Sequence, residues 1–367
     1  MKTLRPLIFV LCLLALGARA EPVIQEPKAF TTTITRDVNL GYLLYLPDGY
    51  EDSEEKWPLI LFLHGSGERG SDIEAVKANG IAKNLDAGTN LPFIVVSPQC
   101  PRNTSWQDSL MVEALNSLLD DVIARYRVDE ERVYLTGLSM GGHGTWALAG
   151  EYPDRFAAIA PVCGAGEADY APALRRLPIW VFHGALDDVV DPGESEYMVD
   201  ALKKCDGNVE FTLYPDANHN SWTVTYNNPE LYEWFLSHTR PARPVYLDLS
   251  SAIATASSGE AEKAIDGDPG TRWETLWSDP QRLEIDLGKT TRLRQMTIQW
   301  EYAYSSAYDV LASDDGENWK TVFSREDADG VVDVIGFPED TAARYIRLDC
   351  KARGTEYGHS IWEITLE

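Results

Sequence analysis

The stretch RVYLTGLSMGGHGTW, residues 132–146, decides the fold and directs attention to one serine. Its first residues, RVYLT, form a short apolar run typical of a buried strand, and a helical stretch follows at residues 143–150. Small residues flank Ser139, as a sharp strand-to-helix turn requires because side chains at those positions would clash. The pentad Gly-x-Ser-x-Gly is also compatible with a plain turn, but the flanking strand and helix favour a turn that presents a nucleophilic serine.

Strands and helices alternate on both sides of this turn, from about Thr31 to Leu236. We expect buried strands at residues 58–64, 93–97, 132–136, 157–161, 179–183 and 209–214. Between them, residues 109–125 carry apolar side chains at helical spacing. This alternation predicts an α/β fold with a mainly parallel sheet covered by helices on both faces.

The pattern changes after residue 238. Residues 239–245, TRPARPV, contain two prolines and two arginines and are expected to be a linker. Beyond them, short alternating runs at 282–287, 295–300, 307–312 and 345–348 are separated by Gly, Asp, Ser and Asn, which predicts an antiparallel β-sandwich. The expected domains are therefore 21–238, a catalytic domain, and 246–367, the sandwich.

The first twenty residues have the features of a signal peptide. Lys2 and Arg5 precede an apolar run at residues 7–16, and Ala18-Arg19-Ala20 provides a cleavage site. A membrane anchor is the alternative, but the apolar run is too short to span a bilayer. We expect cleavage after Ala20 and secretion to the periplasm or the outside.

Charge and cysteine usage exclude several functions. The formal net charge of -26 repels nucleic acids and anionic membranes, so neither is an expected partner. No Cys-x-x-Cys pair indicates zinc or redox chemistry. Four cysteines follow the leader, Cys100, Cys163, Cys205 and Cys350, and their spacing does not predict a pairing.

A nucleophilic serine needs a histidine to take its proton and a carboxylate to orient that histidine. In a fold of this kind the chain order is serine, acid, histidine. Asp187 follows the strand at 179–183 and is the expected acid, with Asp188 and Asp191 in the same loop as competitors. His219 follows the last predicted strand and is the expected base.

The other five histidines are weaker candidates for the base. His64 and His183 end apolar strands and are expected to be structural, His143 lies on the helix after the serine, and His238 and His359 fall outside the pattern.

Two backbone N–H groups should stabilise the oxyanion that forms when the serine attacks a carbonyl. Met140, the residue after the nucleophile, is expected to supply one, and Ser66, with Gly67 as the next candidate, the other. Trp106 and Trp222 are expected to line the substrate cleft.

The stretch from Tyr42 to Leu236 resembles the bacterial esterase branch of the α/β-hydrolases, which includes carboxylesterase, dienelactone-hydrolase and feruloyl- or acetylxylan-esterase-like proteins. The motifs are YLPDGY, PLILFLHGSGERG, SPQCP, LTGLSMGGHGTW, VFHGALDDVVD, FTLYPDANHNSW and LYEWFL. The resemblance implies a serine esterase without a catalytic cofactor, and it gives Ser139, Asp187 and His219 the catalytic roles. Asp191 stands where the family usually has a proline.

Residues from about Val245 onward resemble the discoidin, or F5/8 type C, domain in its family 32 carbohydrate-binding branch. The motifs are ATASSGEAEKAIDGDPGTRW, LEIDLG, SDDGENW, ARYIRL and YGHSIWEI. Oxygen donors of Asp266, Asp268 and Thr271 in a tight loop suit calcium, although a plain Asp-Gly turn is the alternative. The resemblance adds Glu363 and the carbonyls of Lys263 and Trp362 to one structural metal site.

Aromatic side chains on the sandwich loops are candidates for stacking on sugar rings. We expect Trp277, Tyr302, Tyr304 and Tyr357 in this role, and Trp273 and Trp300 in the core.

The sequence thus favours a secreted serine esterase acting on acetyl or feruloyl esters of polysaccharides. A peptidase of the prolyl-oligopeptidase-like type and a catalytically inert carbohydrate-binding or adhesion protein are the alternatives.

Overall fold

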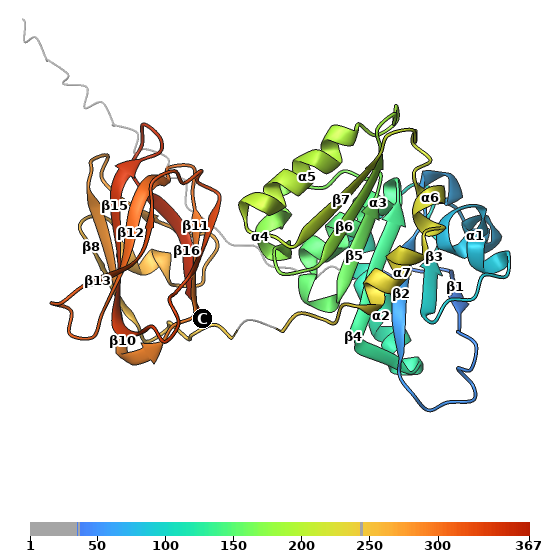
Figure 1. Cartoon of the computed structure of the whole chain (residues 1–367), viewed down its shortest axis with the longest axis horizontal. Coiled ribbons are helices and arrows are strands. Elements are labelled where there is room, and N and C mark those ends of the chain that lie inside the picture. Colours follow the sequence, from blue (N-terminus) through green and yellow to red (C-terminus); the bar gives the residue numbers. More distant parts are fainter. Residues whose placement is uncertain (1–34, 36, 243–244) are drawn as a thin grey trace, which may run out of the picture. The chain divides into compact units, whose positions relative to one another are not determined.

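A computed structural model describes residues 35, 37–242 and 245–367 of the chain (Figure 1). The predicted signal peptide, residues 1–20, lies outside the described residues. Across the described part of the chain, none of the helices combines the length and the apolar character needed to cross a membrane.

A seven-stranded sheet organises the first part of the chain, with the order β1-β3-β2-β4-β5-β6-β7. Only β1 runs antiparallel to its neighbour, and the other pairs are parallel. The strands are β1 (Tyr42–Tyr45), β2 (Trp57–Leu63), β3 (Ile94–Pro98), β4 (Val128–Leu138), β5 (Ala158–Val162), β6 (Ile179–Gly184) and β7 (Val209–Tyr214). All six predicted strands are present, and the half-buried edge strand β1 is an addition.

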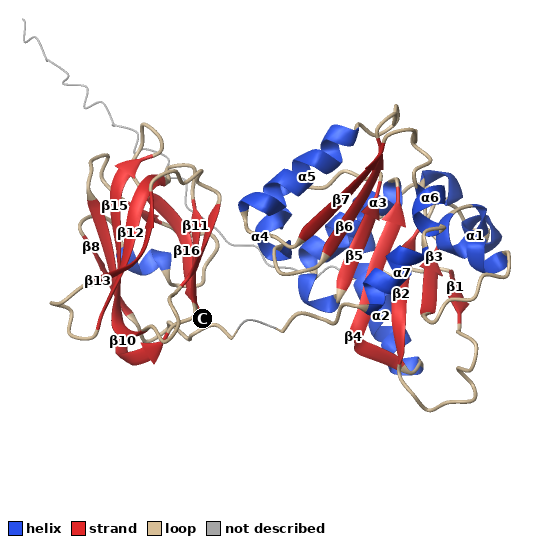
Figure 2. Cartoon of the chain, viewed as in Figure 1, coloured by secondary structure: helices blue, strands red, loops and turns tan. Residues whose placement is uncertain are grey.

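Helices cover both faces of this sheet, as Figure 2 shows in blue. Alternate residues of β2 point to opposite faces, so Leu59, Leu61 and Leu63 pack with α2, α3 and α5, while Ile60 and Phe62 pack with α1, α6 and α7. The helices are α1 (Gly80–Asp86), α2 (Ser109–Arg125), α3 (Met140–Glu151), α4 (Ala171–Leu174), α5 (Pro192–Lys204), α6 (Trp222–Tyr226) and α7 (Pro229–Leu236). The two-sided cover confirms the predicted α/β fold.

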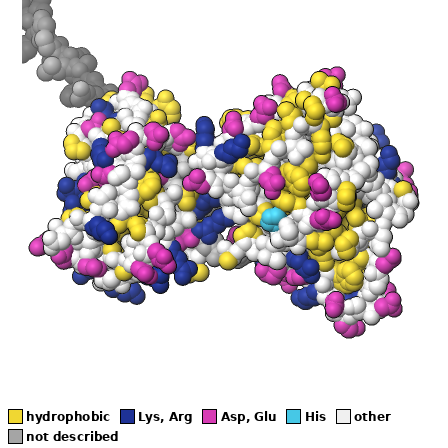
Figure 3. Space-filling view, viewed as in Figure 1, with side chains coloured by type: hydrophobic (Ala, Val, Ile, Leu, Met, Phe, Trp, Pro, Cys, Tyr) yellow, Lys and Arg dark blue, Asp and Glu magenta, His cyan; other side chains and the backbone are white. Residues whose placement is uncertain are grey.

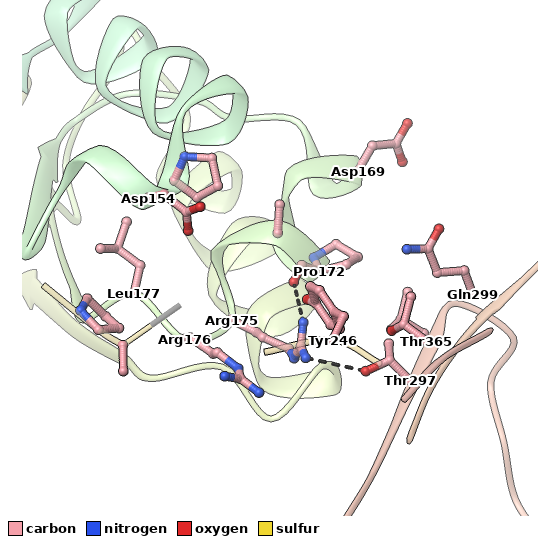
Figure 4. A pocket seen from close by; sticks show the side chains of 15 residues that line it. Asp154, Asp169, Pro172, Arg175, Arg176, Leu177, Tyr246, Thr297, Gln299 and Thr365 are labelled. Atoms are coloured by element: carbon pink, nitrogen blue, oxygen red, sulfur yellow. Dashed lines mark hydrogen bonds between the residues drawn. The ribbon is translucent and has the colours of Figure 1, made fainter. Parts of the chain in front are cut away.

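The short helix α4 leads the chain into β6. Arg175 follows α4, and its Nη1 atom donates to the carbonyl of Pro172 at 3.2 Å (Figure 4). This bond joins the residue after α4 to a carbonyl of the same helix, where side-chain donors commonly satisfy the last carbonyls. Leu177 is buried and lies just before β6, the strand whose following loop contains Asp187.

The second part of the chain is a β-sandwich in which all strand pairs are antiparallel. One sheet has the order β13-β12-β15-β10-β8 and the other β14-β11-β16-β9. The strands are β8 (Ile253–Ala256), β9 (Trp273–Glu274), β10 (Gln281–Arg292), β11 (Gln295–Trp300), β12 (Ser305–Ser313), β13 (Lys320–Arg325), β14 (Val332–Gly336), β15 (Ala342–Arg353) and β16 (Ser360–Leu366). Trp273 and Trp300 are buried between the sheets, which confirms their predicted place in the core.

Acidic side chains are spread over the face of the molecule drawn in Figure 3, in keeping with the net charge of -26. The cysteines among the described residues, Cys100, Cys163, Cys205 and Cys350, are free thiols in buried positions. Burial raises the pKa of the Cys163 thiol to about 12, so this side chain stays protonated at neutral pH.

Candidate active site

Ser139 occupies a strained turn between β4 and α3. Its φ of 53° and ψ of -117° are rare for a residue with a side chain, and such backbone strain costs about 1–3 kcal/mol. A Cβ atom added to Gly137 would lie 2.4 Å from the carbonyl oxygen of Gly141, and one added to Gly141 would lie 2.0 Å from that of Leu63. The turn therefore requires glycine on both sides of the serine.

The structure brings the predicted serine, acid and base together. His219, in the loop after β7, places its Nε2 atom 2.9 Å from Ser139 Oγ. Its Nδ1 atom lies 2.7 Å from Oδ2 of Asp187, in the loop after β6. An ionised carboxylate only accepts hydrogen bonds, so the proton belongs on Nδ1 and the Nε2 lone pair faces the serine hydroxyl. This arrangement allows His219 to remove the serine proton.

Asp187 is buried and accepts more than one hydrogen bond. Oδ1 accepts from the backbone N–H groups of Val189 at 2.9 Å and Val190 at 3.0 Å. Burial by itself would raise the pKa of the Asp187 carboxyl, but the hydrogen bonds from His219, Val190 and Val189 outweigh it and lower the pKa below its ordinary value. The group is therefore an ionised acceptor at neutral pH.

The two competing carboxylates lie elsewhere. Asp188 is exposed. Asp191 is also exposed and caps α5 by accepting from the backbone N–H of Gly193 at 2.9 Å. Only Asp187, of these three, contacts the His219 ring.

The two predicted oxyanion donors lie at the starts of helical turns. Met140 begins α3, and Ser66 begins the 3₁₀ helix η1 (Ser66–Glu68) that follows β2. Within the described ranges, neither backbone N–H donates to a carbonyl or side chain. Both are therefore available to an anionic oxygen, and the partial positive charge at the N-terminus of α3 would favour one.

A series of side-chain contacts connects the loop of Ser66 with the loop of His219. The sequence did not predict it. Glu68 is buried, and its Oε1 accepts from Asn79 Nδ2 at 2.5 Å. Asn79 Oδ1 in turn accepts from Trp222 Nε1 at 3.3 Å, and the Trp222 ring meets the His219 ring edge-on at a centroid distance of 5.3 Å. The acidic residue Glu68, within the motif PLILFLHGSGERG, was the sequence feature that could have indicated these contacts.

The prediction that Trp106 lines the cleft is wrong. Its side chain is 0% exposed, because its Nε1 atom donates inward to the carbonyl of His64 at 3.0 Å and its Cβ lies against Gly144. The loop between β3 and α2 thus turns this ring inward, against His64 and Gly144. Trp222, by contrast, is partly exposed beside His219.

A cavity of about 440 Å³ lies beside α3 and has mainly polar walls, formed by Gln107, Asp108, His143, Trp146, Glu167, Tyr170 and neighbouring backbone. His143 stands one helical turn after Ser139, and its Nδ1 atom accepts from the N–H of Ala165 at 2.9 Å. Burial, with the nearby rings of His219 and His183, lowers the pKa of His143. This ring is therefore neutral at physiological pH and forms a polar wall near the serine.

His64 is buried, and both ring nitrogens have backbone partners. Nε2 accepts from the N–H of Cys100 at 3.0 Å, and Nδ1 lies 2.6 Å from the carbonyl of Gly65. Burial lowers the pKa of His64. The expected structural role agrees with these contacts.

The predicted metal loop of the sandwich gathers carboxylates. Asp266 accepts from Thr271 Oγ1 at 2.8 and 3.0 Å and from the N–H of Asp268 at 2.9 Å. Glu363 on β16 reaches the same loop and accepts from the N–H of Gly267 at 3.0 Å. Burial, followed by the charge of Asp266, raises the pKa of Glu363 to about 7. The all-oxygen chemistry of these side chains is the kind that a hard cation such as calcium takes.

The two residues predicted to contribute carbonyls lie next to this loop. Lys263 belongs to the 3₁₀ helix η5 (Ala261–Ala264), and its side chain pairs with Glu260. Trp362 precedes Glu363 on β16, and its ring packs under the Arg272 guanidinium.

Three of the four predicted sugar-stacking aromatics form one exposed group. Trp277 is 63% exposed and Tyr302 72%, and both contact Tyr357, with ring centroids 5.5 and 6.2 Å from it. Tyr304 differs, because its ring is only partly exposed and packs against Gly330 and Gly354. Trp277, Tyr302 and Tyr357 are hereafter the aromatic group.

Three family models match different parts of the chain. Residues 35–168 match the family model described as "Putative esterase", and residues 165–240 match "Prolyl oligopeptidase family". The matches support a carboxylic ester hydrolase. Residues 249–364 match the model of the F5/8 type C domain.

Similar proteins agree with these matches. The chain is 32% identical to "Putative esterase NocK" of Nocardia uniformis subsp. tsuyamanensis, over 46% of this chain and 53% of that protein. It is 31% identical to the bifunctional acetylxylan esterase/xylanase XynS20E of Neocallimastix patriciarum, over 48% of this chain and 26% of that protein. It thus spans about half or less of these relatives.

The sandwich has solved structures among its relatives. It is 36% identical to chitosan-binding module 1 of a chitosanase/glucanase from Paenibacillus sp. IK-5, a likeness that covers 33% of this chain and 98% of the module with a TM-score of 0.32.

Proposed function

We propose that this protein is a secreted serine esterase that hydrolyses acetyl or feruloyl esters of polysaccharides through an acyl-enzyme. The observation that carries the proposal is the continuous hydrogen-bonded line from Ser139 Oγ to His219 at 2.9 Å and from His219 to Asp187 at 2.7 Å. Predicted domains at 21–238 and 246–367, joined by 239–245, would separate catalysis from sugar binding.

Acylation begins when Ser139 Oγ attacks the ester carbonyl carbon while His219 Nε2 takes the hydroxyl proton. The carbonyl oxygen becomes an oxyanion, which the backbone N–H groups of Met140 and Ser66 stabilise. The imidazolium then gives its proton to the leaving alcohol oxygen as the carbon–oxygen bond breaks. Asp187 stabilises the transient charge on His219.

Deacylation repeats these steps with water. His219 removes a proton from a water molecule, whose oxygen attacks the acyl carbon, and the proton then returns to Ser139 Oγ as the acid leaves. No step requires a cofactor. Trp222, beside His219, offers an apolar surface to the ester.

The polysaccharide part of the proposal depends on the sandwich. Exposed rings supply contact area for sugar faces at low entropic cost, and the aromatic group offers three of them. A similar module is named a chitosan-binding module. The relative XynS20E is named a bifunctional acetylxylan esterase/xylanase. We propose that the aromatic group holds the enzyme on the polymer that carries its ester substrate.

A calcium ion would be structural in this scheme. Asp266, Asp268, Thr271 and Glu363, with the carbonyls of Lys263 and Trp362, would hold it. It would take no part in ester hydrolysis.

The test is the release of acetate and ferulate from acetylated and feruloylated xylan, with Ser139→Ala as the control. Release by the wild type and its loss in the variant are expected. A wild type that releases neither acid, from xylan or from p-nitrophenyl acetate, contradicts the proposal.

A peptidase is the second candidate, because residues 165–240 match the prolyl oligopeptidase family. Hydrolysis of p-nitrophenyl acetate with no cleavage of peptide anilides would favour the esterase, and the reverse would favour the peptidase. An inert carbohydrate-binding or adhesion protein is the third. Failure of a labelled fluorophosphonate to react with Ser139 would favour it.

A further inference from the structure

A second imidazole contacts the acid of the site. His183, the penultimate residue of β6, is fully buried, and its Nε2 atom lies 3.1 Å from Oδ2 of Asp187. The same oxygen accepts from Nδ1 of His219. Two histidine rings, one on β6 and one in the loop after β7, therefore meet at one carboxylate oxygen.

The other contacts of His183 determine where its proton lies. Nε2 is also 3.0 Å from the carbonyl of Val190, so it faces two groups that only accept hydrogen bonds. It must carry a hydrogen. Nδ1 lies 2.7 Å from the hydroxyl of Ser195, a fully buried residue on α5. A hydroxyl can donate to a bare nitrogen, so a neutral ring with its proton on Nε2 satisfies every partner.

We infer that His183 is a positioning residue for catalysis: its Nε2–H fixes the Asp187 carboxylate that orients His219. The inference rests on the proposed function. With His183 present, each Asp187 oxygen has two donors, namely Val189 and Val190 on Oδ1 and the two histidines on Oδ2. The carboxylate plane can then no longer rotate away from His219.

The contact between His183 and Asp187 also affects the charge that the Asp187 carboxylate presents to His219. A second donor on Oδ2 draws part of the negative charge of Asp187 away from His219, which makes the carboxylate less basic and limits how far it raises the proton affinity of His219. Without that donor, the acid limb of the pH–rate profile should move to higher pH. A merely structural histidine would have no such effect.

The titratable groups around His183 come from four elements. Asp187 follows its own strand, His219 follows β7, and His143 lies on α3. Cys163 follows β5, and its Sγ atom lies within 4.8 Å of a carboxylate oxygen of Asp187 and a ring nitrogen of His219. Since the Cys163 thiol stays protonated, the charge balance at Asp187 depends on the two contacting histidines.

The first experiment compares His183→Phe with His183→Gln. Phenylalanine keeps a planar ring but has no N–H, whereas the glutamine amide places an N–H near the position of Nε2. We expect His183→Phe to lower kcat about 10- to 100-fold with little change in KM, and to move the acid limb to higher pH. His183→Gln should recover most of the activity and the original limb.

A folded His183→Phe enzyme with unchanged kcat and acid limb would overturn the inference. So would a loss of activity that glutamine does not recover, with the limb unmoved. Ser139→Ala distinguishes a failure of this inference from a failure of the proposed function. If that variant stays active, the serine esterase mechanism itself is wrong. If it is inactive, the His183 variants test the positioning role alone.

A second measurement needs no variant. Proton–nitrogen NMR of the wild type labelled with ¹⁵N-histidine should show a slowly exchanging Nε2–H on His183 near pH 8, together with the Nδ1–H of His219. A His183 proton found on Nδ1 instead would overturn the inference, because the ring would then present a lone pair to Asp187.

Discussion

The Nδ1 atom of His219 lies 2.7 Å from the Oδ2 atom of Asp187, although 32 residues separate them in the chain. The contact exists because β6 and β7 are adjacent and parallel, so the loops at their carboxyl ends meet at one edge of the sheet. The strained turn between β4 and α3 presents Ser139 at the same edge. Parallel topology thus assembles three groups from separate loops.

Ser139→Ala should abolish ester hydrolysis. Removal of the hydroxyl leaves no nucleophile for the acyl-enzyme, so kcat on p-nitrophenyl acetate should fall roughly 10⁴- to 10⁶-fold. A labelled fluorophosphonate should react with the wild type and not with the variant. Circular dichroism should show that the variant folds, and substantial activity in a folded variant would rule out the serine mechanism.

Asp187→Asn should nearly eliminate activity while Asp188→Asn should not. The asparagine NH2 group can donate to Nδ1 of His219, which moves the ring proton to Nε2, so the wrong tautomer faces Ser139 and kcat falls about 10⁴-fold. Asp188 is an exposed neighbour and provides a matched control. If the Asp188 variant were instead the inactive one, the assignment of the acid would be wrong.

Asp187 should also make stability depend on pH. Its folded pKa is below the ordinary value, so its stabilising contribution is present above about pH 4 and is lost as the pH falls through the lower folded pKa. Urea unfolding of the wild type and Asp187→Asn should therefore show a difference in the free energy of unfolding at pH 6 that shrinks toward pH 3. A difference that grows on acidification would contradict this.

Calcium should stabilise the sandwich. A cation that binds only the folded loop raises the thermal midpoint by mass action, by about 2–4 °C near saturation. Scanning calorimetry with calcium and then with excess chelator should show a reversible increase. Asp266→Asn should remove the increase, and Asp327→Asn, at an exposed position on another loop, should keep it.

The aromatic group should control adhesion to polysaccharide without affecting the chemistry. Trp277→Ala together with Tyr357→Ala removes two of its three rings, and binding to insoluble chitosan or xylan in a depletion assay should fall about tenfold or more. Tyr197→Ala removes an exposed ring from α5 and should leave binding intact. Hydrolysis of p-nitrophenyl acetate should be equal in all three proteins.

Residues close together in the chain could be interpreted from sequence. The helix at residues 109–125 was predicted with the bounds that the structure gives it, because its apolar spacing reports one buried face. The glycines around Ser139 indicated the turn. The order serine, acid, histidine along the chain indicated Asp187 as the acid and His219 as the base. The edge strand β1 escaped prediction because its YLLY run is half-buried and lacks a clear pattern.

Contacts between distant segments were decided by the tertiary structure. Trp106 was expected to line the cleft and is buried, since the polar loop around it does not reveal whether its ring turns outward or inward. His183 had the sequence position of a core residue, and the pairing of β6 with β7 brings His219 to the same Asp187 oxygen that His183 contacts. The sequence determines periodicity, turns and the inventory of reactive groups, because these depend on neighbours along the chain. Which groups touch depends on the path of the folded backbone, and only the tertiary structure sets that.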